Sequence, residues 1–186
     1  MFTNNRLKPY YRIIICISIL TFSFCTSPTS PSTPINYIQG NTYFCGDLKM
    51  QLTLPTNWLI TKDTVDNGSS YLLVGHKISS GANFNLLAGL YNATSNMNVM
   101  LDSAKIEIGS QFPGAITVTS QTVTIHNHIF GEYVVNVTMN GNALTMKQVY
   151  IFNNSNLIVF TFGDLNSNYP NSVLDFNTME NSIQFN

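Results

Sequence analysis

The sequence contains few charged residues. They make up 9% of its 186 residues, against about a quarter in ordinary globular proteins. The formal net charge is −1, and three of the eight basic residues lie within residues 1–12. The chain after residue 24 therefore carries five lysines against nine acidic residues. A mildly acidic chain without a basic patch argues against nucleic acid as a partner.

Cysteine is also scarce, with three residues in the chain. Cys16 lies inside the first apolar run, which leaves Cys25 and Cys45 for the rest of the protein. In an oxidising compartment these two can form a disulfide. If Cys25 is modified instead, Cys45 stands alone, and its surroundings favour a buried, small apolar residue over a reactive thiol.

Motifs for enzyme chemistry are absent from the sequence. No G-x-S-x-G motif is present, and no acidic residue forms a recognisable catalytic pattern with a histidine. Asp102 and Glu107 are five residues apart on an expected helix, so they lie on different faces and do not form a glycosidase pair. We therefore expect the acidic residues on a solvated surface, a protein that is not an enzyme, and no cofactor.

The segment His126-Asn127-His128 has the most metal-like pattern. Two histidines at positions i and i+2 of one strand point the same way, and His76 offers a third ligand. However, Asn127 favours a tight turn that separates the two rings, and no cysteine or carboxylate cluster completes the set. We therefore expect no metal site.

The N-terminal segment has the layout of an export signal. Residues 1–12 carry three positive charges, and residues 13–24, IIICISILTFSF, form a continuous apolar run. This run is short for a membrane-spanning helix, which needs about 20 residues. The sequence predicts a signal peptide over residues 1–24. A permanent anchor helix is the alternative.

Cys25 follows this apolar run directly. The segment Phe22–Cys25 resembles a bacterial lipobox, in which the cysteine is acylated and becomes the new N-terminus. Ser23 fits the lipobox pattern, whereas Phe24 departs from it because the residue before the cysteine is normally small. The alternative is ordinary signal peptidase cleavage, for example after Ser27.

A polar tether follows Cys25. Residues 26–34 are Pro, Ser and Thr only, so this stretch has nothing to bury. We expect a lipid-anchored tether over residues 25–41 that holds a folded domain, residues 42–186, away from a membrane. The predicted location is the bacterial cell envelope, at the outer membrane or cell surface rather than free in the periplasm.

The folded domain is expected to centre on the hairpin Gln148–Phe162. Two apolar runs flank Asn153–Asn156, which has the composition of a hairpin turn. Apolar residues occupy both alternating sets of positions in these runs, so both faces of the hairpin should be covered. Helices are the expected cover, because two segments elsewhere have a helical period.

Hydrophobic periodicity gives the order of the other elements. We expect an α+β fold in which helices cover an antiparallel sheet of six to seven strands, in an α/β/α sandwich. The predicted strands are residues 49–54, 71–78, 84–91, 116–125, 128–139, 143–152 and 157–162, with helices over 96–109 and from Pro170 onward, and a short terminal strand over 183–185.

Trp58 is the single tryptophan and follows the turn at Pro55. A large aromatic residue at the edge of a sheet usually closes the core. The functional alternative is that Trp58 forms one wall of a groove for a ligand or a partner.

Several of these features together resemble the PsbP-like fold. They are the L-P-x-x-W pattern of Leu54–Trp58, the helix in the middle of the chain, and the ending. In that ending Tyr150–Phe152, a turn and Val159–Phe162 precede a helix that starts at a tyrosine and leads into Asn181–Phe185. The resemblance covers roughly residues 44–186 and includes the DcrB-type lipoproteins of the bacterial cell envelope. It implies a binding or assembly module with no shared catalytic residues.

The sequence therefore predicts a non-enzymatic, membrane-tethered envelope lipoprotein. Its expected role is that of an interaction or assembly module, and its expected partners are the membrane, through the lipid on Cys25, and another envelope protein. The alternative is a carrier of a small molecule or a metal.

Overall fold

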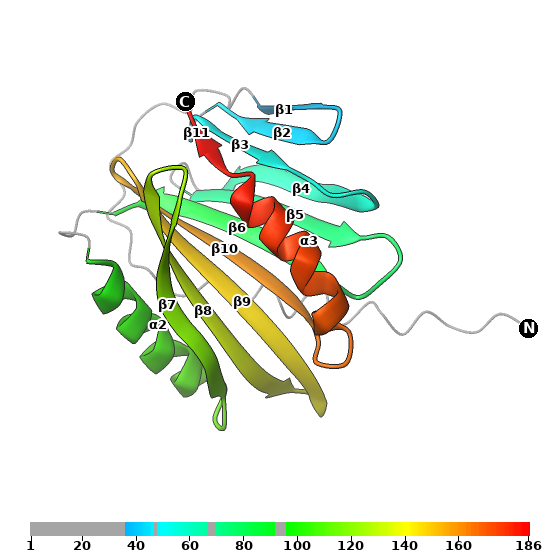
Figure 1. Ribbon diagram of the computed structural model, residues 1–186, viewed down its shortest axis with the longest axis vertical. Helices are drawn as coiled ribbons and strands as arrows, with labels where there is room; N and C mark the ends of the chain where they lie inside the picture. Colours follow the sequence, from blue (N-terminus) through cyan, green and yellow to red (C-terminus); the bar gives the residue numbers. More distant parts are fainter. Residues whose placement is uncertain (1–35, 47, 67–69, 92–95) are drawn as a thin grey trace, which may run out of the picture.

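The computed structural model describes residues 36–46, 48–66, 70–91 and 96–186, and for residues 62–66 and 70–72 it describes the backbone only. Two antiparallel sheets and two helices make up the fold (Figure 1). The elements in chain order are β1 (Asn36–Gln39), β2 (Thr42–Cys45), β3 (Met50–Thr53), β4 (Trp58–Asp66), β5 (Ser70–Lys77), β6 (Asn83–Leu90), α2 (Met97–Gln111), β7 (Ile116–Ile125), β8 (His128–Met139), β9 (Asn142–Asn153), β10 (Asn156–Leu165), α3 (Tyr169–Asn181) and β11 (Gln184–Phe185).

The large sheet has seven strands in the order β4-β5-β6-β10-β9-β8-β7. Two of its hairpins have turns in which both central residues adopt positive φ, namely His126-Asn127 (47° and 65°) and Asn140-Gly141 (50° and 77°). Asparagine and glycine tolerate this conformation, and its twist matches that of the paired strands. The tight turn expected at Asn127 and the hairpin expected at Asn140-Gly141 are both confirmed.

The hairpin of β9 and β10 lies in the interior of the large sheet, as expected from the sequence. β10 pairs with β6 on one side and with β9 on the other, and β9 also pairs with β8. Alternate residues of the hairpin enter two different cores. Val149, Ile151, Ile158, Phe160 and Phe162 enter one core, and Tyr150, Leu157 and Val159 enter the other.

Helix α2 covers one face of the large sheet. Asn96 caps the helix, and its side-chain oxygen accepts hydrogen bonds from the backbone N–H groups of Asn98 and Val99. Gly131 of β8 allows close contact, since a Cβ at this position would lie 2.5 Å from the sulfur of Met97. The apolar stripe expected from the helical period is confirmed, and its buried members are Met97, Met100, Leu101, Ala104 and Ile108.

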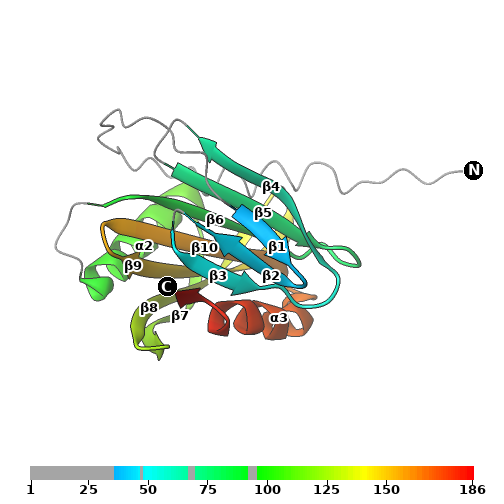
Figure 2. The same ribbon diagram turned by 90° about the horizontal axis from the view of Figure 1, so that it is seen from above.

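The other face is covered by α3 together with a second, smaller sheet (Figures 1 and 2). This sheet has the strand order β1-β2-β3-β11. Its last pairing joins Gln184 and Phe185 near the end of the chain to Gln51 and Met50. The expected α+β fold, with an antiparallel sheet that carries a helix on each face, is confirmed, and on this face β2 and β3 supply part of the cover beside α3.

Three strands, β1, β2 and β4, are not among those expected from the sequence. β1 begins at Asn36, so the folded part extends into residues 25–41, which the sequence analysis assigned to the tether. β4 was not expected as a strand, because Pro55 and Asn57 precede it and suggest a loop. It pairs with β5, and its register shifts between Ile60 and Lys62, opposite Gly75. A Cβ at Gly75 would lie 2.4 Å from the ring of Phe84, which explains the glycine.

Candidate functional site

Trp58 begins β4 directly after the turn that leaves β3. Asn57 adopts a left-handed φ of 69°, which turns the chain sharply before the strand. The indole of Trp58 then enters the space between the two sheets, where its ring centroid lies 5.7 Å from that of Phe84 and 5.8 Å from that of Phe176. Trp58 is 5% exposed, so it belongs to the core as well as to the surface feature described below.

A carboxylate on α3 fixes the position of the indole. The indole N–H of Trp58 donates a hydrogen bond to Oδ2 of Asp175 over 2.9 Å. The ammonium group of Lys77 on β5 donates to the same oxygen over 2.7 Å. This arrangement ties β4 and β5 to α3 and satisfies the only polar group of the indole.

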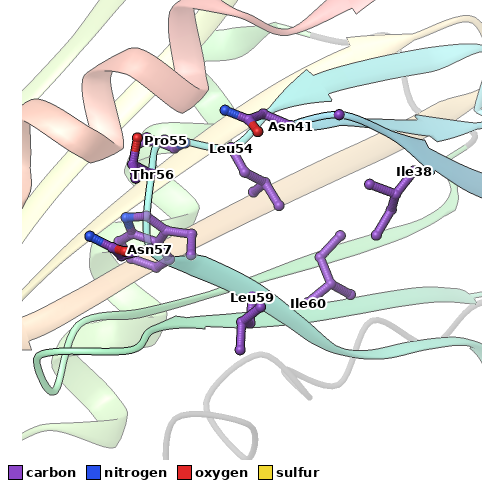
Figure 3. A pocket seen from close by; sticks show the side chains of 10 residues that line it. Ile38, Asn41, Leu54, Pro55, Thr56, Asn57, Leu59 and Ile60 are labelled. Carbon is purple, nitrogen blue, oxygen red and sulfur yellow. The ribbon is translucent and has the colours of Figure 1, made fainter.

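A pocket of about 300 Å³ opens beside Trp58, between β4 and the hairpin of β1 and β2 (Figure 3). In Figure 3 the side chains of Ile38, Leu54 and Ile60 converge on its centre, whereas Leu59 points away from it. Ile38 is 55% exposed, so this apolar wall is accessible from outside. The lining residues are Ile38, Gly40, Asn41, Leu54, Pro55, Thr56, Asn57, Trp58, Leu59 and Ile60, and we call this feature the Trp58 pocket.

The Trp58 pocket combines aliphatic side chains with the polar side chains of Asn41, Thr56 and Asn57. None of the residues that line it carries a charge. Burial of apolar surface is worth about 25 cal/mol per Å², so an aliphatic or aromatic side chain of a partner gains free energy by entering it.

The histidines singled out in the sequence are not brought together. Nε2 of His126 lies 2.9 Å from the carbonyl oxygen of Asn181, and the ring of His128 packs on Phe185 at 5.0 Å. His76 lies on β5, four strand positions away from β8. Within residues 36–46, 48–66, 70–91 and 96–186, no group of three or more His, Cys, Asp or Glu side chains is placed to hold a metal ion.

Cys45 is 2% exposed and belongs to the core between the two sheets. Its burial agrees with its expected role as a small apolar residue. Cys25, the predicted lipid attachment site, lies outside the described residues.

A buried charge cluster was missed by the sequence analysis. The ammonium group of Lys147 on β9 lies 2.7 Å from a carboxylate oxygen of Glu132 and also bonds to the carboxylate of Glu180 on α3. It further donates a 3.1 Å hydrogen bond to the side chain of Asn177. The expectation of a solvated surface for the acidic residues is thus wrong for Glu180, which is buried, as is Asp164.

The two carboxylates of this cluster differ in their proton affinity. Burial raises the pKa of Glu180 to about 7, despite the opposing effect of Lys147, and the nearby Glu132 adds to the rise. Burial also disfavours the charged form of Glu132, but hydrogen bonds from Lys147 and Gln121 outweigh this effect and lower the pKa of Glu132. The two carboxylates share the ammonium group of Lys147. As the pH falls, Glu180 takes up a proton before Glu132 does.

A signal for this cluster was present in the sequence. Lys147 lies within the strand ALTMKQVYIF, where both alternating sets of positions are apolar. A lysine at such a position is expected to be buried, and a buried ammonium group needs a carboxylate partner. The identity of the partner was not readable, because Glu132 and Glu180 are 15 and 33 residues away in the chain.

Comparison with known proteins gives a fold but no close relative. No sequence profile of a known protein family matches the chain, and no curated protein matches it. Among solved structures, the cyanobacterial PsbP of Synechocystis (CyanoP) aligns with a TM-score of 0.62 at 11% identity, over 87% of this chain and 99% of that chain.

Two further structures support the same architecture. A protein of Bacteroides thetaiotaomicron aligns with a TM-score of 0.56 at 12% identity, over 80% of this chain and 49% of that chain. A Pseudomonas aeruginosa protein of unknown function, described as a putative regulator, aligns with a TM-score of 0.51 at 13% identity, over 81% of this chain and 96% of that chain. The chain therefore has a PsbP-like α+β fold, and identities at this level show the fold alone.

Neither described helix combines the length and the apolar character that a bilayer span requires.

Proposed function

We propose that this protein is an exported, membrane-tethered and non-enzymatic module of the bacterial cell envelope, and that it binds another envelope protein through the Trp58 pocket. The observation that carries this proposal is the pocket itself. Its apolar wall is accessible, and its indole is held in place by Asp175. A rigid, preformed apolar pocket loses little conformational entropy on binding, which favours recognition of a partner's side chain.

The N-terminal sequence supports the envelope location. A basic start, an apolar run of a dozen residues and a cysteine at its boundary are the parts of a lipoprotein signal. In this proposal Cys25 carries lipid, in the manner of the DcrB-type lipoproteins that the chain resembles. Two or more acyl chains anchor a protein stably, whereas one chain binds only marginally.

The tether places the Trp58 pocket near the membrane in this proposal. Ile38 follows Cys25 by 13 residues, a length that spans roughly 45 Å at most when extended. A partner that reaches the pocket is therefore itself held at the same membrane or bound close to it.

The carrier alternative requires polar groups that select a small molecule. Small-molecule sites combine apolar walls with a few convergent polar groups. The side chains that converge in the Trp58 pocket are aliphatic, and Asn41 and Asn57 lie at its margin (Figure 3). This arrangement suits an apolar side chain of a protein better than a polar metabolite.

Site-specific photo-crosslinking tests the interaction. A photoreactive amino acid replaces Ile38 in the pocket wall, and in the control it replaces Ile106 of α2, which is 75% exposed. We expect one discrete adduct with an envelope protein from the Ile38 position, which is lost when Ile60→Asp puts a charge in the pocket. Equal adducts from both positions, or none from Ile38, would contradict the proposal.

Labelling with radioactive palmitate tests the anchor separately. We expect label in the wild-type chain and none in Cys25→Ser, which should be released from the membrane or left unprocessed. An unlabelled, soluble mature protein would overturn the lipoprotein assignment and leave a secreted domain.

A further inference from the structure

The large sheet ends at β7, and the outer edge of this strand is open. β7 pairs with β8 and is the last strand in the sheet order. Seven of its ten residues are exposed, including Ser120, Thr122 and Thr124, which lie on the face toward α2. Helix α2 therefore leaves the middle of β7 uncovered, and its outer edge is accessible to another strand.

β7 lacks two of the features that keep sheet edges from pairing with other chains, namely charge and proline. Its sequence ITVTSQTVTI contains no charged residue and no proline, and eight of its ten residues are Ile, Val or Thr. The sequence of β4 at the opposite edge, WLITKDTVD, contains three charged residues. Charge and proline are the usual means by which an exposed edge avoids pairing, whereas β-branched residues favour it.

A bulge defines the part of β7 that can pair regularly. The register against β8 shifts between Thr117 and Thr119, and such a bulge twists the strand locally. The regular stretch is therefore Thr119–Ile125, with Thr122 at its centre.

We propose that two copies of this chain associate by antiparallel pairing of Thr119–Ile125 about a two-fold axis at Thr122. When a strand pairs antiparallel with its own copy, the two-fold axis that relates the two copies is perpendicular to the sheet. The face of the sheet that α2 covers is then on the same side in both copies. Opposed residues must then lie an even number of positions apart. An axis at Thr122 meets this condition and uses the whole regular stretch.

The residues that become opposed favour a second copy as the occupant. On the face toward α2, Thr122 meets Thr122 of the second copy, and Ser120 meets Thr124 of the second copy. Cross-strand pairs of Thr and Ser contribute roughly 0.2–1 kcal/mol each. A two-fold axis sets a strand against its own copy, and β7, which carries no charge, places no like charges opposite each other.

Pairing at β7 leaves the proposed partner site open. β4, which borders the Trp58 pocket, and β7 are at opposite ends of the large sheet. The two pockets therefore lie at the two outer ends of the continuous sheet that the pair would form. Self-association and partner binding use different surfaces, so each can fail without the other.

The test compares two lysine substitutions at exposed threonines, measured on the intact chain purified in mild detergent. Thr122→Lys sets two ammonium groups against each other at the axis, and Thr61→Lys places the same group on β4 as the matched control. Light scattering that separates protein mass from detergent mass gives the oligomeric state. We expect a dimer for wild type and Thr61→Lys, and self-association weakened about tenfold or more by Thr122→Lys, a loss of about 1.4 kcal/mol. Circular dichroism checks that all three chains are folded.

A cysteine variant tests the register independently of any loss of association. Oxidation of Thr122→Cys with copper phenanthroline should give a disulfide between the two copies of residue 122, identified as a linked peptide by mass spectrometry. Ile106→Cys, exposed on α2, should give none. A monomeric wild type, a dimer insensitive to Thr122→Lys, or equal disulfide formation at both positions would overturn the proposal.

Discussion

The two helices are held to the two faces of the large sheet by different chemistry. α2 buries a stripe of five apolar residues, and burial of such a side chain contributes about 1.5–3 kcal/mol. α3 buries only two apolar side chains, Phe176 and Met179, and it buries Ser172 and Glu180 beside them. The contacts that α2 itself buries are thus all apolar, although the sheet beneath it also buries the uncharged polar residues Asn85, Gln148 and Thr161. The contacts of α3 include a buried hydroxyl and a buried carboxylate of its own.

The polar contacts of α3 are spaced along the helix and give it a fixed position. Ser172 donates to Asp164 near the start of the helix, Asp175 accepts from Trp58 in its first half, and Glu180 bonds to Lys147 near its end. Hydrogen bonds depend on direction and distance, whereas apolar contacts tolerate sliding. The face that fixes α3 in one position is also the face that holds Trp58 at the pocket.

A charge introduced on the α2 face should have the largest effect. Val159 enters this core, which offers no partner for a carboxylate, so Val159→Asp costs several kcal/mol and should unfold the protein. Circular dichroism and a thermal melt measure this, with Val159→Ala as the smaller, uncharged control. A folded and cooperative Val159→Asp variant would mean that the hairpin is not covered on both faces.

Removal of the ammonium group on the α3 face should have the next largest effect. Lys147→Met leaves the buried Glu180 and the partly buried Glu132 without their common partner, which typically costs about 3–5 kcal/mol. Chemical denaturation above neutral pH measures the change. The triple variant Lys147→Met, Glu132→Gln and Glu180→Gln removes the charge imbalance and should recover most of the loss. If it is no more stable than Lys147→Met, the cluster does not control how α3 is held.

Glu180 should make the stability of the protein depend on pH. Its pKa of about 7 is above the value of 4.5 expected in the unfolded chain, so its protonation favours the folded state. This contribution is fully present below about pH 4.5 and is lost as the pH rises through 7. The free energy of unfolding should fall by roughly 2–3 kcal/mol across this window.

Glu180→Gln provides the control for this pH dependence. The variant should keep nearly constant stability between pH 5 and pH 8, since the lowered pKa of Glu132 acts only at more acid pH. Denaturant titrations across this range measure both proteins. An equal slope in wild type and variant would assign the pH dependence to another group.

The contact between α3 and the indole should have the smallest effect on stability. Asp175→Ala removes the acceptor shared by Trp58 and Lys77, at a cost of about 1–2 kcal/mol for the unpaired indole N–H. Lys77→Met removes only a partly exposed ion pair and should cost about 1 kcal/mol or less. Trp58 is the single tryptophan, so acrylamide quenching of its fluorescence should rise in Asp175→Ala and stay near wild type in Lys77→Met.

The sequence was informative where local patterns determine structure. The helical period placed α2 and its buried residues, and Asn140-Gly141 placed a hairpin through its turn conformation. Two strands of the small sheet, β3 and the terminal strand β11, were predicted, but their pairing with each other was not, because it joins Phe185 to Met50 across most of the chain. Local periodicity carries no information about such a pair.

The candidate site was predictable only in part. Trp58 stood out as the single tryptophan, placed after a turn, and it closes the core as expected and lines the pocket. Its contact with a ligand or a partner stays a prediction. Its partner Asp175 is 117 residues away in the chain and follows no motif. Contacts of this kind arise from the packing of α3 on the sheet and appear only in three dimensions.

The most direct test of the central proposal is a titration of the purified chain with the envelope protein captured at Ile38, followed through the fluorescence of Trp58. We expect a saturable change in emission, because a partner side chain that enters the Trp58 pocket changes the surroundings of the indole beside it. Ile38→Lys should weaken this binding about tenfold or more, and Ile106→Lys should leave it unchanged. Unchanged emission, or equal affinity of wild type and both variants, would show that the Trp58 pocket is not the binding surface.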